Sequence, residues 1–188
     1  MHKILPKYYH FIDSFNKNHI KNLDKNIAII FRDYSKPLNL KDIISIKKFC
    51  KITGRKFFIS NDIKLALKLD IDGVYLPSFN KSLRINNYSK KTSFIIIGSA
   101  HNSNEIKVKE RQNVDAIFLA SLFNVKKTYL GMKKFQILKN KTNTKIIALG
   151  GINKNNIKKL KLLDVYGFAG ISFFKEDKKK RPFKKRAV

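Results

Sequence analysis

The chain has 188 residues, 43% of them hydrophobic, and a formal net charge of +28 from 41 Lys and Arg against 13 Asp and Glu. This length fits one domain with a sizeable core, and no apolar run approaches the roughly 20 residues of a membrane helix. The N-terminus lacks the apolar core of a signal peptide, and the single cysteine, Cys50, excludes a disulfide framework or a cysteine metal cluster. We therefore expect a cytoplasmic protein in which Cys50 is a buried structural thiol.

Eight short apolar runs predict eight strands. The runs stay apolar through most of their length, which is typical of strands that are covered on both faces. In chain order they are residues 8–12, 27–32, 56–60, 73–76, 94–99, 116–120, 145–149 and 167–172.

Most segments between these runs are rich in lysine and carry apolar residues at helical spacing, such as Ile43, Ile46 and Phe49. Residues 38–42 indicate the start of a helix, and Gly54 indicates its end. Residues 82–91 predict one or two helical turns, and residues 153–164 predict a helix.

The alternation of strands and helices predicts a single-domain α/β protein, a short (β/α)8 TIM barrel over residues 1–174. A doubly wound open sheet is the alternative. Residues 175–188 form a separate basic tail with eight Lys or Arg and two acids, and we expect this tail to be flexible.

The remaining +22 of charge is spread over the body of the chain, mostly as lysine on predicted helix faces. The phenylalanines lie inside the strand runs, as Phe57, Phe58 and Phe118 do, and do not alternate with the basic residues as in a nucleic-acid-binding stripe. Two interpretations stay open. The charge is a solvated surface that reflects compositional bias, or it gives a non-specific electrostatic affinity for polyanions such as nucleic acid.

Two runs, 146–153 and 167–172, end in glycine or a small polar residue. Because a phosphate binds against bare backbone at such positions, they predict an anionic small molecule at the carboxyl ends of the strands. In a barrel, functional residues lie on the loops that follow the strands. Those loops are rich in groups that bind phosphate and poor in carboxylates, and they contain Arg32, Asp33, Tyr34, Ser60, Asn61, Asp62, Pro77, Ser78, Asn80, Ser99, Ala100, His101, Asn102, Ser121, Asn124, Lys126, Lys127, Gly150, Gly151 and Ser172.

Four segments, 72–76, 98–102, 148–152 and 167–171, resemble in order and spacing the thiamine phosphate synthase family, which includes the TenI-like thiazole tautomerases. The resemblance runs from about Tyr8 to Phe174. It implies a (β/α)8 barrel that joins hydroxymethylpyrimidine diphosphate to thiazole phosphate, releases pyrophosphate and uses Mg²⁺. The implied partners are phosphorylated small-molecule substrates. We expect no membrane partner, and the sequence leaves open whether the chain forms a homo-oligomer.

The resemblance also implies roles for individual residues. The backbone amides of Gly150, Gly151, Ile171 and Ser172 hold the thiazole phosphate. The catalytic set is Arg32, Ser99 and Lys126, the substrate-binding set is Asn61, His101 and Lys127, and the metal ligands are Asp62 and Asn80.

The chain departs from the family pattern at the metal and diphosphate side. Only Arg32 remains of a Gln-x-Arg-x-Lys motif, and an Asn-Asp pair falls on Ser60 and Asn61, with Asp62 one residue late. The second metal carboxylate falls on Asn80, and the tautomerase histidine falls near Ser121. The alternative function is therefore a non-catalytic phosphate-ligand binder on the same scaffold, and a further one is a polyanion-binding basic protein.

Several residues also have plain structural interpretations. Gly150 and Gly151 could form only a tight turn, Arg32 could pair with Asp33 at the surface, and His101 could be a hydrogen-bonding partner in its loop. Lys126 and Lys127 could be two of many surface lysines. The histidines at positions 2, 10 and 19 show no ligand spacing, so no zinc site is expected.

Overall fold

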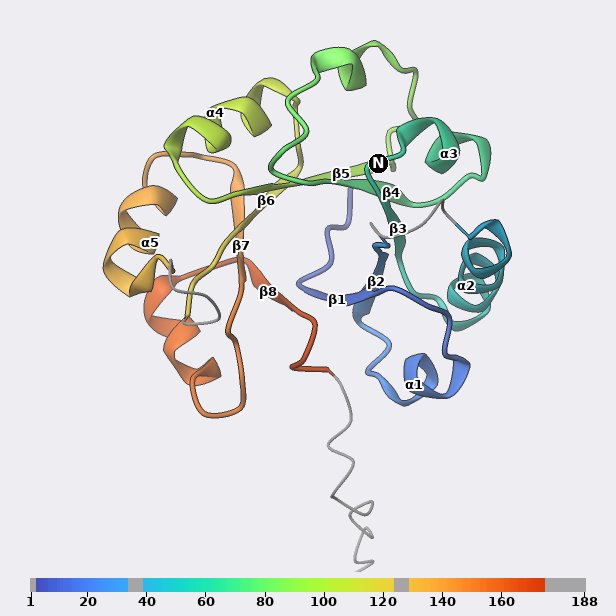
Figure 1. The fold of residues 1–188 in the computed structure, drawn as a ribbon, viewed down its shortest axis with the longest axis horizontal. Helices are drawn as coiled ribbons and strands as arrows, with labels where there is room; N and C mark the ends of the chain where they lie inside the picture. The colour runs from blue at the N-terminus through green and yellow to red at the C-terminus, as the bar shows by residue number, and fades with distance from the viewer. Residues whose placement is uncertain (1–2, 34–38, 124–128, 175–188) are drawn as a thin grey trace, which may run out of the picture.

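The computed structural model describes residues 3–33, 39–123 and 129–174 (Figure 1). The predicted basic tail, and with it the boundary at residue 174, lies outside the described residues, as do Tyr34, Asn124, Lys126 and Lys127. Within the described ranges, no helix is long and apolar enough to cross a membrane.

Eight parallel strands pair in sequence order and close into a barrel, with β8 returning to β1 (Figure 1). The closed ring confirms the predicted (β/α)8 barrel and excludes the open sheet. Each predicted strand is present, with its ends within two residues of the expected ones. The strands are β1 (Tyr8–Ile12), β2 (Ile27–Phe31), β3 (Phe57–Ser60), β4 (Gly73–Leu76), β5 (Ile95–Ala100), β6 (Ala116–Leu119), β7 (Lys145–Leu149) and β8 (Gly167–Gly170).

Helical segments follow the strands and form the outer ring (Figure 1). The predicted limits of the second helix are confirmed, because Asn39 caps it through the amides of Lys41 and Asp42, and Gly54 ends it at a φ of 68°. The segments are α1 (Lys17–Asn22), α2 (Leu40–Thr53), α3 (Ile63–Lys68), the 3₁₀ helix η1 (Leu83–Asn87), α4 (Ser103–Arg111), α5 (Gly131–Lys139) and the 3₁₀ helix η2 (Ile157–Leu163).

The prediction for residues 153–164 needs correction, because only the short 3₁₀ helix η2 forms there. The side-chain oxygen of Asn153 accepts hydrogen bonds from the amides of Asn155 and Asn156. These are the bonds of a helix start, made to the second and third amides on as Asn39 makes them at α2, so they do not explain the 3₁₀ form of η2. Residues 154–156 form a turn before η2.

Two apolar layers hold the barrel together. Inward-facing aromatic rings fill its interior, with Tyr9 packed against Phe118 and Phe11 against Tyr75 at centroid distances of 5.1 and 5.2 Å. Outward-facing side chains of the strands pack under the helices in a second cluster, which includes Cys50. Burial raises the pKa of the Cys50 thiol to about 12, as expected for a structural cysteine.

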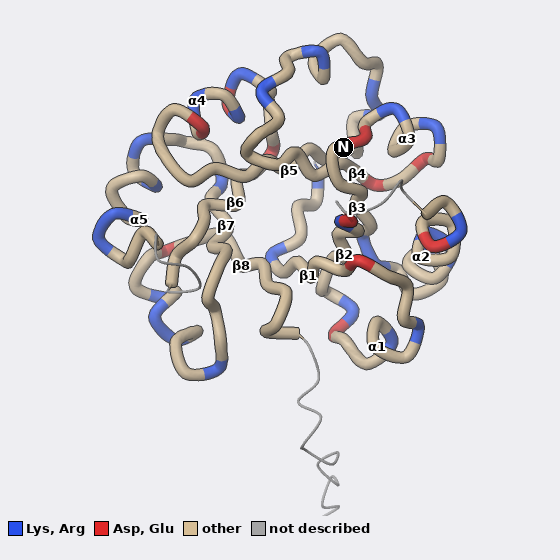
Figure 2. The backbone as a smooth tube through the Cα atoms, in the orientation of Figure 1, with Lys and Arg blue, Asp and Glu red and all other residues tan. Residues whose placement is uncertain are grey.

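Lys and Arg are distributed around the outer ring of helices and their connections (Figure 2). Among the described residues, two basic side chains, those of Arg55 and Lys109, are buried and not at the surface. Arg55 donates to the carbonyls of Leu23 and Asp24, which ties the loop before β2 to the loop before β3. Lys109 lies under the loop that follows β4.

Candidate active site

The glycines after β7 adopt a conformation that favours glycine. Gly150 has a φ of 95° and Gly151 a φ of 71°. A Cβ on Gly150 would lie 2.1 Å from Ser121 Oγ, and one on Gly151 would lie 2.8 Å from the backbone of Phe123. Both dihedral angle and space therefore require glycine here.

Neighbouring loops fix this glycine turn from both sides. The amides of Leu122 and Phe123 donate to the carbonyls of Leu149 and Gly150, at 2.9 and 3.0 Å. On the other side, Asn156 Nδ2 donates to the carbonyl of Gly151 at 2.8 Å. The carbonyls of the turn are thus used by the protein itself.

The loop after β8 lies beside the glycine turn, because Leu149 and Ala169 are register partners at the ends of β7 and β8. Ile171 and Ser172 are exposed there. Four amides are predicted to bind phosphate, those of Gly150, Gly151, Ile171 and Ser172. Among the described residues, none of these amides donates a backbone hydrogen bond outside helices and strands. The two loops therefore bring these donors to adjacent strand ends with no backbone partner in the described chain.

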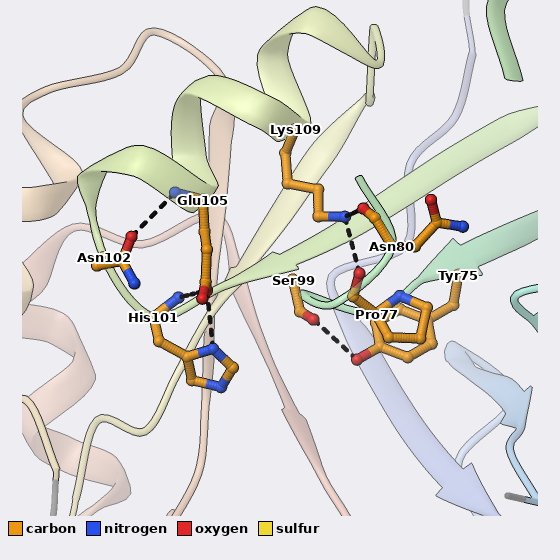
Figure 3. Close-up of polar contacts among 8 residues, drawn as sticks. All are labelled: Tyr75, Pro77, Asn80, Ser99, His101, Asn102, Glu105 and Lys109. Atoms are coloured by element: carbon orange, nitrogen blue, oxygen red, sulfur yellow. Dashed lines mark hydrogen bonds and ion pairs between the residues drawn. The ribbon is translucent and has the colours of Figure 1, made fainter. Parts of the chain in front are cut away.

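A row of polar groups continues the inward-facing pattern of β2 to β5 at the same end of the barrel. The Tyr75 hydroxyl donates to Ser99 Oγ at 3.0 Å, and both residues are buried (Figure 3). The Arg32 guanidinium lies 4.6 Å from the centroid of the Phe11 ring. Ser60 Oγ is buried with no hydrogen-bond partner in the described residues. Arg32 directly follows β2, and Ser99 lies inside β5 near its end, not on the loop after it. Tyr75 was not singled out from the sequence, although its alternation with outward-facing neighbours was visible there.

His101 is held at the start of α4 by Glu105. Both its backbone amide and its Nδ1 lie within hydrogen-bond distance of Glu105 Oε2, at 2.7 and 2.9 Å (Figure 3). Asn102 caps the same helix through the amide of Glu105. This geometry matches the interpretation of His101 as a hydrogen-bonding partner in its loop.

The loops after β3 and β4 carry the predicted metal ligands and Asn61. Asp62 Oδ1 accepts the amide of Leu65 and so caps α3. Asn80 Nδ2 donates to Asn61 Oδ1 at 2.7 Å, and Asn80 Oδ1 accepts the amide of Ser82 at 3.0 Å. Within the described ranges, no group of three or more His, Cys, Asp or Glu residues could hold a metal ion. The predicted ligands offer one carboxylate, that of Asp62, and one of its two oxygens caps α3.

The structure also brings together two histidines that the sequence left apart. His10 on β1 and His19 on α1 have Nε2 atoms 2.8 Å apart, and His10 Nδ1 lies 3.2 Å from the carbonyl of Gly170. His10 is buried, and its spacing of nine residues from His19 gave no helical or strand signal. The pair ties α1 to the end of β8.

A family model described as thiamine monophosphate synthase matches residues 22–174. A thiamine-phosphate synthase of Clostridium tetani is 31% identical over 157 residues, which cover 77% of this chain and 74% of that protein. One from Prochlorococcus marinus subsp. pastoris is 32% identical over 135 residues, 70% of this chain, and this chain spans only 38% of that longer relative. The solved thiamine phosphate pyrophosphorylase of Pyrococcus furiosus has the same fold, with a TM-score of 0.73 at 22% identity, covering 92% of this chain and 89% of that one. The chain belongs to the thiamine monophosphate synthase family.

Proposed function

We propose that this protein condenses hydroxymethylpyrimidine diphosphate with thiazole phosphate to form thiamine phosphate and pyrophosphate. The observation that carries the proposal is the pair of loops after β7 and β8, whose amides have no backbone partner in the described chain, at the same end of the barrel as the polar row that contains Arg32, Tyr75 and Ser99. We assign the phosphate to the strand ends of β7 and β8 and the diphosphate to those of β2 to β5. Such an arrangement suits a reaction between two phosphorylated small molecules.

The thiazole phosphate binds at the glycine turn and the loop after β8. Phosphate oxygens accept hydrogen bonds from backbone amides that no side chain shields, as they do in other glycine-rich loops. The amides of Gly151 and Ser172 come from neighbouring strand ends, so the two loops donate hydrogen bonds to the same phosphate. This places the thiazole ring towards the barrel axis.

The diphosphate binds near Arg32 and Ser99. Because Tyr75 donates its hydrogen to Ser99 Oγ, the serine's own hydrogen is free to point to an anion. The guanidinium of Arg32 supplies fixed positive charge at the same end of the barrel. Lys126 and Lys127, which lie outside the described residues, are the further cations that we assign to this side.

The reaction needs charge stabilisation more than proton transfer. The bond between the pyrimidine methylene carbon and the diphosphate oxygen breaks, and its electron pair leaves with the pyrophosphate. The lone pair of the thiazole nitrogen then forms the new carbon–nitrogen bond, so no proton has to move. Preorganised donors aimed at the leaving oxygens are the largest contribution that a protein makes to such a step.

Mg²⁺ bound to the diphosphate would neutralise part of the charge that develops on the leaving group. We propose that Asp62 is the one protein carboxylate that holds it, through the oxygen that does not cap α3. Asn80 adds no charge and has its side-chain amide engaged by Asn61 and Ser82. The ion is then held mainly by substrate oxygens, which predicts weak binding in the absence of diphosphate.

The test is a turnover assay with purified protein, Mg²⁺ and both precursors, in which thiamine phosphate is separated and quantified. We expect product with the wild-type chain and with Lys64→Ala, an exchange on α3 away from the polar row, and a large loss with Arg32→Ala. Absence of product above the enzyme-free background would overturn the proposal.

A second candidate function is a protein that binds a phosphate ligand without turnover. This function is favoured because Asp62 is the single carboxylate of the predicted metal site and Arg32 is all that remains of the Gln-x-Arg-x-Lys motif. Calorimetric binding of thiazole phosphate by a chain that forms no product would select it. We place either activity in the cytoplasm.

The charge of +28 supports a further proposal, a non-specific electrostatic affinity for nucleic acid. This affinity should fall steeply with added salt, because it depends on counterion release. An affinity that is insensitive to salt would contradict it. The sequence leaves open whether the chain forms a homo-oligomer. Sedimentation over a range of protein concentrations measures the oligomeric state.

A further inference from the structure

Lys109 on α4 is a fully buried lysine, with 0% of its surface exposed. Its ammonium donates hydrogen bonds to the carbonyls of Pro77 and Asn80 at 2.8 and 2.7 Å (Figure 3). It donates a third to Gln112 Oε1 at 3.0 Å. All three acceptors are neutral. Lysines are almost never buried to this extent unless they are paired, so this side chain has a specific role.

The stem of Lys109 crosses β5 at Gly98. A Cβ on Gly98 would lie 2.6 Å from Lys109 Cδ, so the glycine leaves the space through which the side chain passes from α4 to the β4 loop. An apolar side chain of the same length would fill this space without the desolvation of a charge. What only the ammonium provides is two hydrogen bonds to carbonyls of the loop after β4, together with a third to Gln112.

Gln112, one helical turn further, binds the same loop from the same side. It is fully buried, and its Nε2 donates to the carbonyls of Asn80 at 3.1 Å and Ser82 at 2.9 Å. The loop between β4 and η1, residues 77–82, has no regular secondary structure. Its carbonyls at positions 77, 80 and 82 are therefore held by side chains of α4.

The network continues from this loop to the barrel mouth. Asn80 Nδ2 donates to Asn61 Oδ1 at 2.7 Å, which joins the β4 loop to the β3 loop. Asn61 has a φ of 61° and precedes Asp62, the cap of α3. Residues that we assign to the diphosphate and metal side thus depend for their position on contacts that begin at α4.

We propose that Lys109, together with Gln112, is a positioning residue for the synthase reaction, which fixes the β4 loop so that Asn80 and Asn61 face the diphosphate. The inference rests on the proposed function for its catalytic consequence. It concerns the diphosphate side alone, because the thiazole phosphate loops lie at β7 and β8.

The experiment compares Lys109→Met with Lys107→Met, a matched control on the same helix with an exposed side chain. Hydrogen exchange reports the loop directly, since the Asn80 amide donates to the carbonyl of Pro77 and the Ser82 amide to Asn80 Oδ1. Hydrogen bonds to charged groups are strong enough that their loss should speed exchange of these two amides by roughly tenfold or more. Lys107→Met should leave both rates unchanged.

Kinetics then separate positioning from general damage. We expect Lys109→Met to raise the KM for the pyrimidine diphosphate by roughly tenfold while the KM for thiazole phosphate stays within about twofold. Gln112→Leu should give the same pattern, and it decides the question if Lys109→Met does not fold. Unchanged exchange rates, or an equal rise of both KM values, would overturn the inference.

Binding of inorganic pyrophosphate with Mg²⁺ distinguishes this inference from the proposed function. If the wild-type chain binds pyrophosphate but forms no thiamine phosphate, the synthase proposal fails, and roughly tenfold weaker binding by Lys109→Met still supports the positioning role. Equal pyrophosphate affinity in both proteins contradicts it. If the wild type neither turns over nor binds pyrophosphate, the catalytic role falls with the proposed function, and the exchange rates alone decide whether Lys109 orders the loop.

Discussion

Replacing Gly150 with alanine tests the phosphate loop most sharply. The residue has a φ of 95°, and the new methyl group would lie 2.1 Å from Ser121 Oγ and 2.9 Å from Ser121 Cα. A left-handed conformation costs an L-residue about 1–2 kcal/mol, and forcing a methyl group into a packed site costs about 1–3 kcal/mol. The sum, about 2–5 kcal/mol, exceeds what a loop absorbs without moving, so the amides of the turn should shift away from the phosphate.

The matched control is Gly54→Ala at the end of α2. Gly54 has a φ of 68°, but a Cβ there meets nothing within 4 Å, so this variant carries the backbone strain without the clash. We expect Gly150→Ala to raise the KM for thiazole phosphate by at least roughly tenfold, since 1.4 kcal/mol corresponds to a factor of ten. Gly54→Ala should lower the melting temperature and leave both KM values unchanged. Equal KM values for thiazole phosphate in the two variants would refute the phosphate-loop assignment.

Three further predictions address the polar row, the metal and the core. Tyr75→Phe keeps the ring but removes the donor to Ser99 Oγ, so kcat/KM should fall by roughly tenfold with little change in melting temperature; an unchanged kcat/KM would show that this hydroxyl has no role. Asn80→Asp adds a second carboxylate near Asp62, and a magnesium titration of activity should show half-saturation at a several-fold lower concentration, whereas no shift would count against magnesium at this loop. Burial raises the pKa of Cys50 from 9.0 to about 12, so above about pH 9 the unfolded chain releases a proton that the folded chain retains. The free energy of unfolding should therefore fall with rising pH more steeply in the wild type than in Cys50→Ala, by up to about 1.4 kcal/mol per pH unit, and parallel denaturation curves would contradict this.

The barrel could be predicted from the sequence because its strands are short apolar runs covered on both faces, separated by segments with helical spacing. The caps of α2 were equally visible, since Asn39 and Gly54 are residues that start and end helices for local reasons. The failure at residues 153–164 is local too. Residues 157–163 are helical but of the 3₁₀ type, and the spacing of the apolar residues does not distinguish a 3₁₀ helix from an α-helix over so short a segment.

The glycine turn after β7 was predictable because glycine is the residue that a positive φ and a close approach require. The polar contact of Tyr75 was not predicted, because the sequence pattern indicates only that a tyrosine inside a strand belongs to the core. The structure shows that its hydroxyl donates to Ser99 Oγ. Its hydrogen bond depends on the register between β4 and β5, which the sequence does not give.

The burial of Lys109 was the hardest feature to predict, because α4 is rich in lysine and Lys107, two residues earlier, is exposed. One signal was available. Lys109 lies three residues after buried Ile106, on the stripe of α4 that faces the barrel. That the space over Gly98 admits its stem follows only from the packing of α4 on β5.

The central claim is that this barrel joins two phosphorylated precursors at the carboxyl ends of its strands. Phosphorus NMR of a mixture of the chain, Mg²⁺, hydroxymethylpyrimidine diphosphate and thiazole phosphate follows all phosphate groups at once. The account predicts that the diphosphate signals are replaced by pyrophosphate in step with the conversion of thiazole phosphate to thiamine phosphate, and that Arg32→Ala abolishes both changes. Spectra that stay those of the two precursors in the presence of the wild-type chain would contradict it.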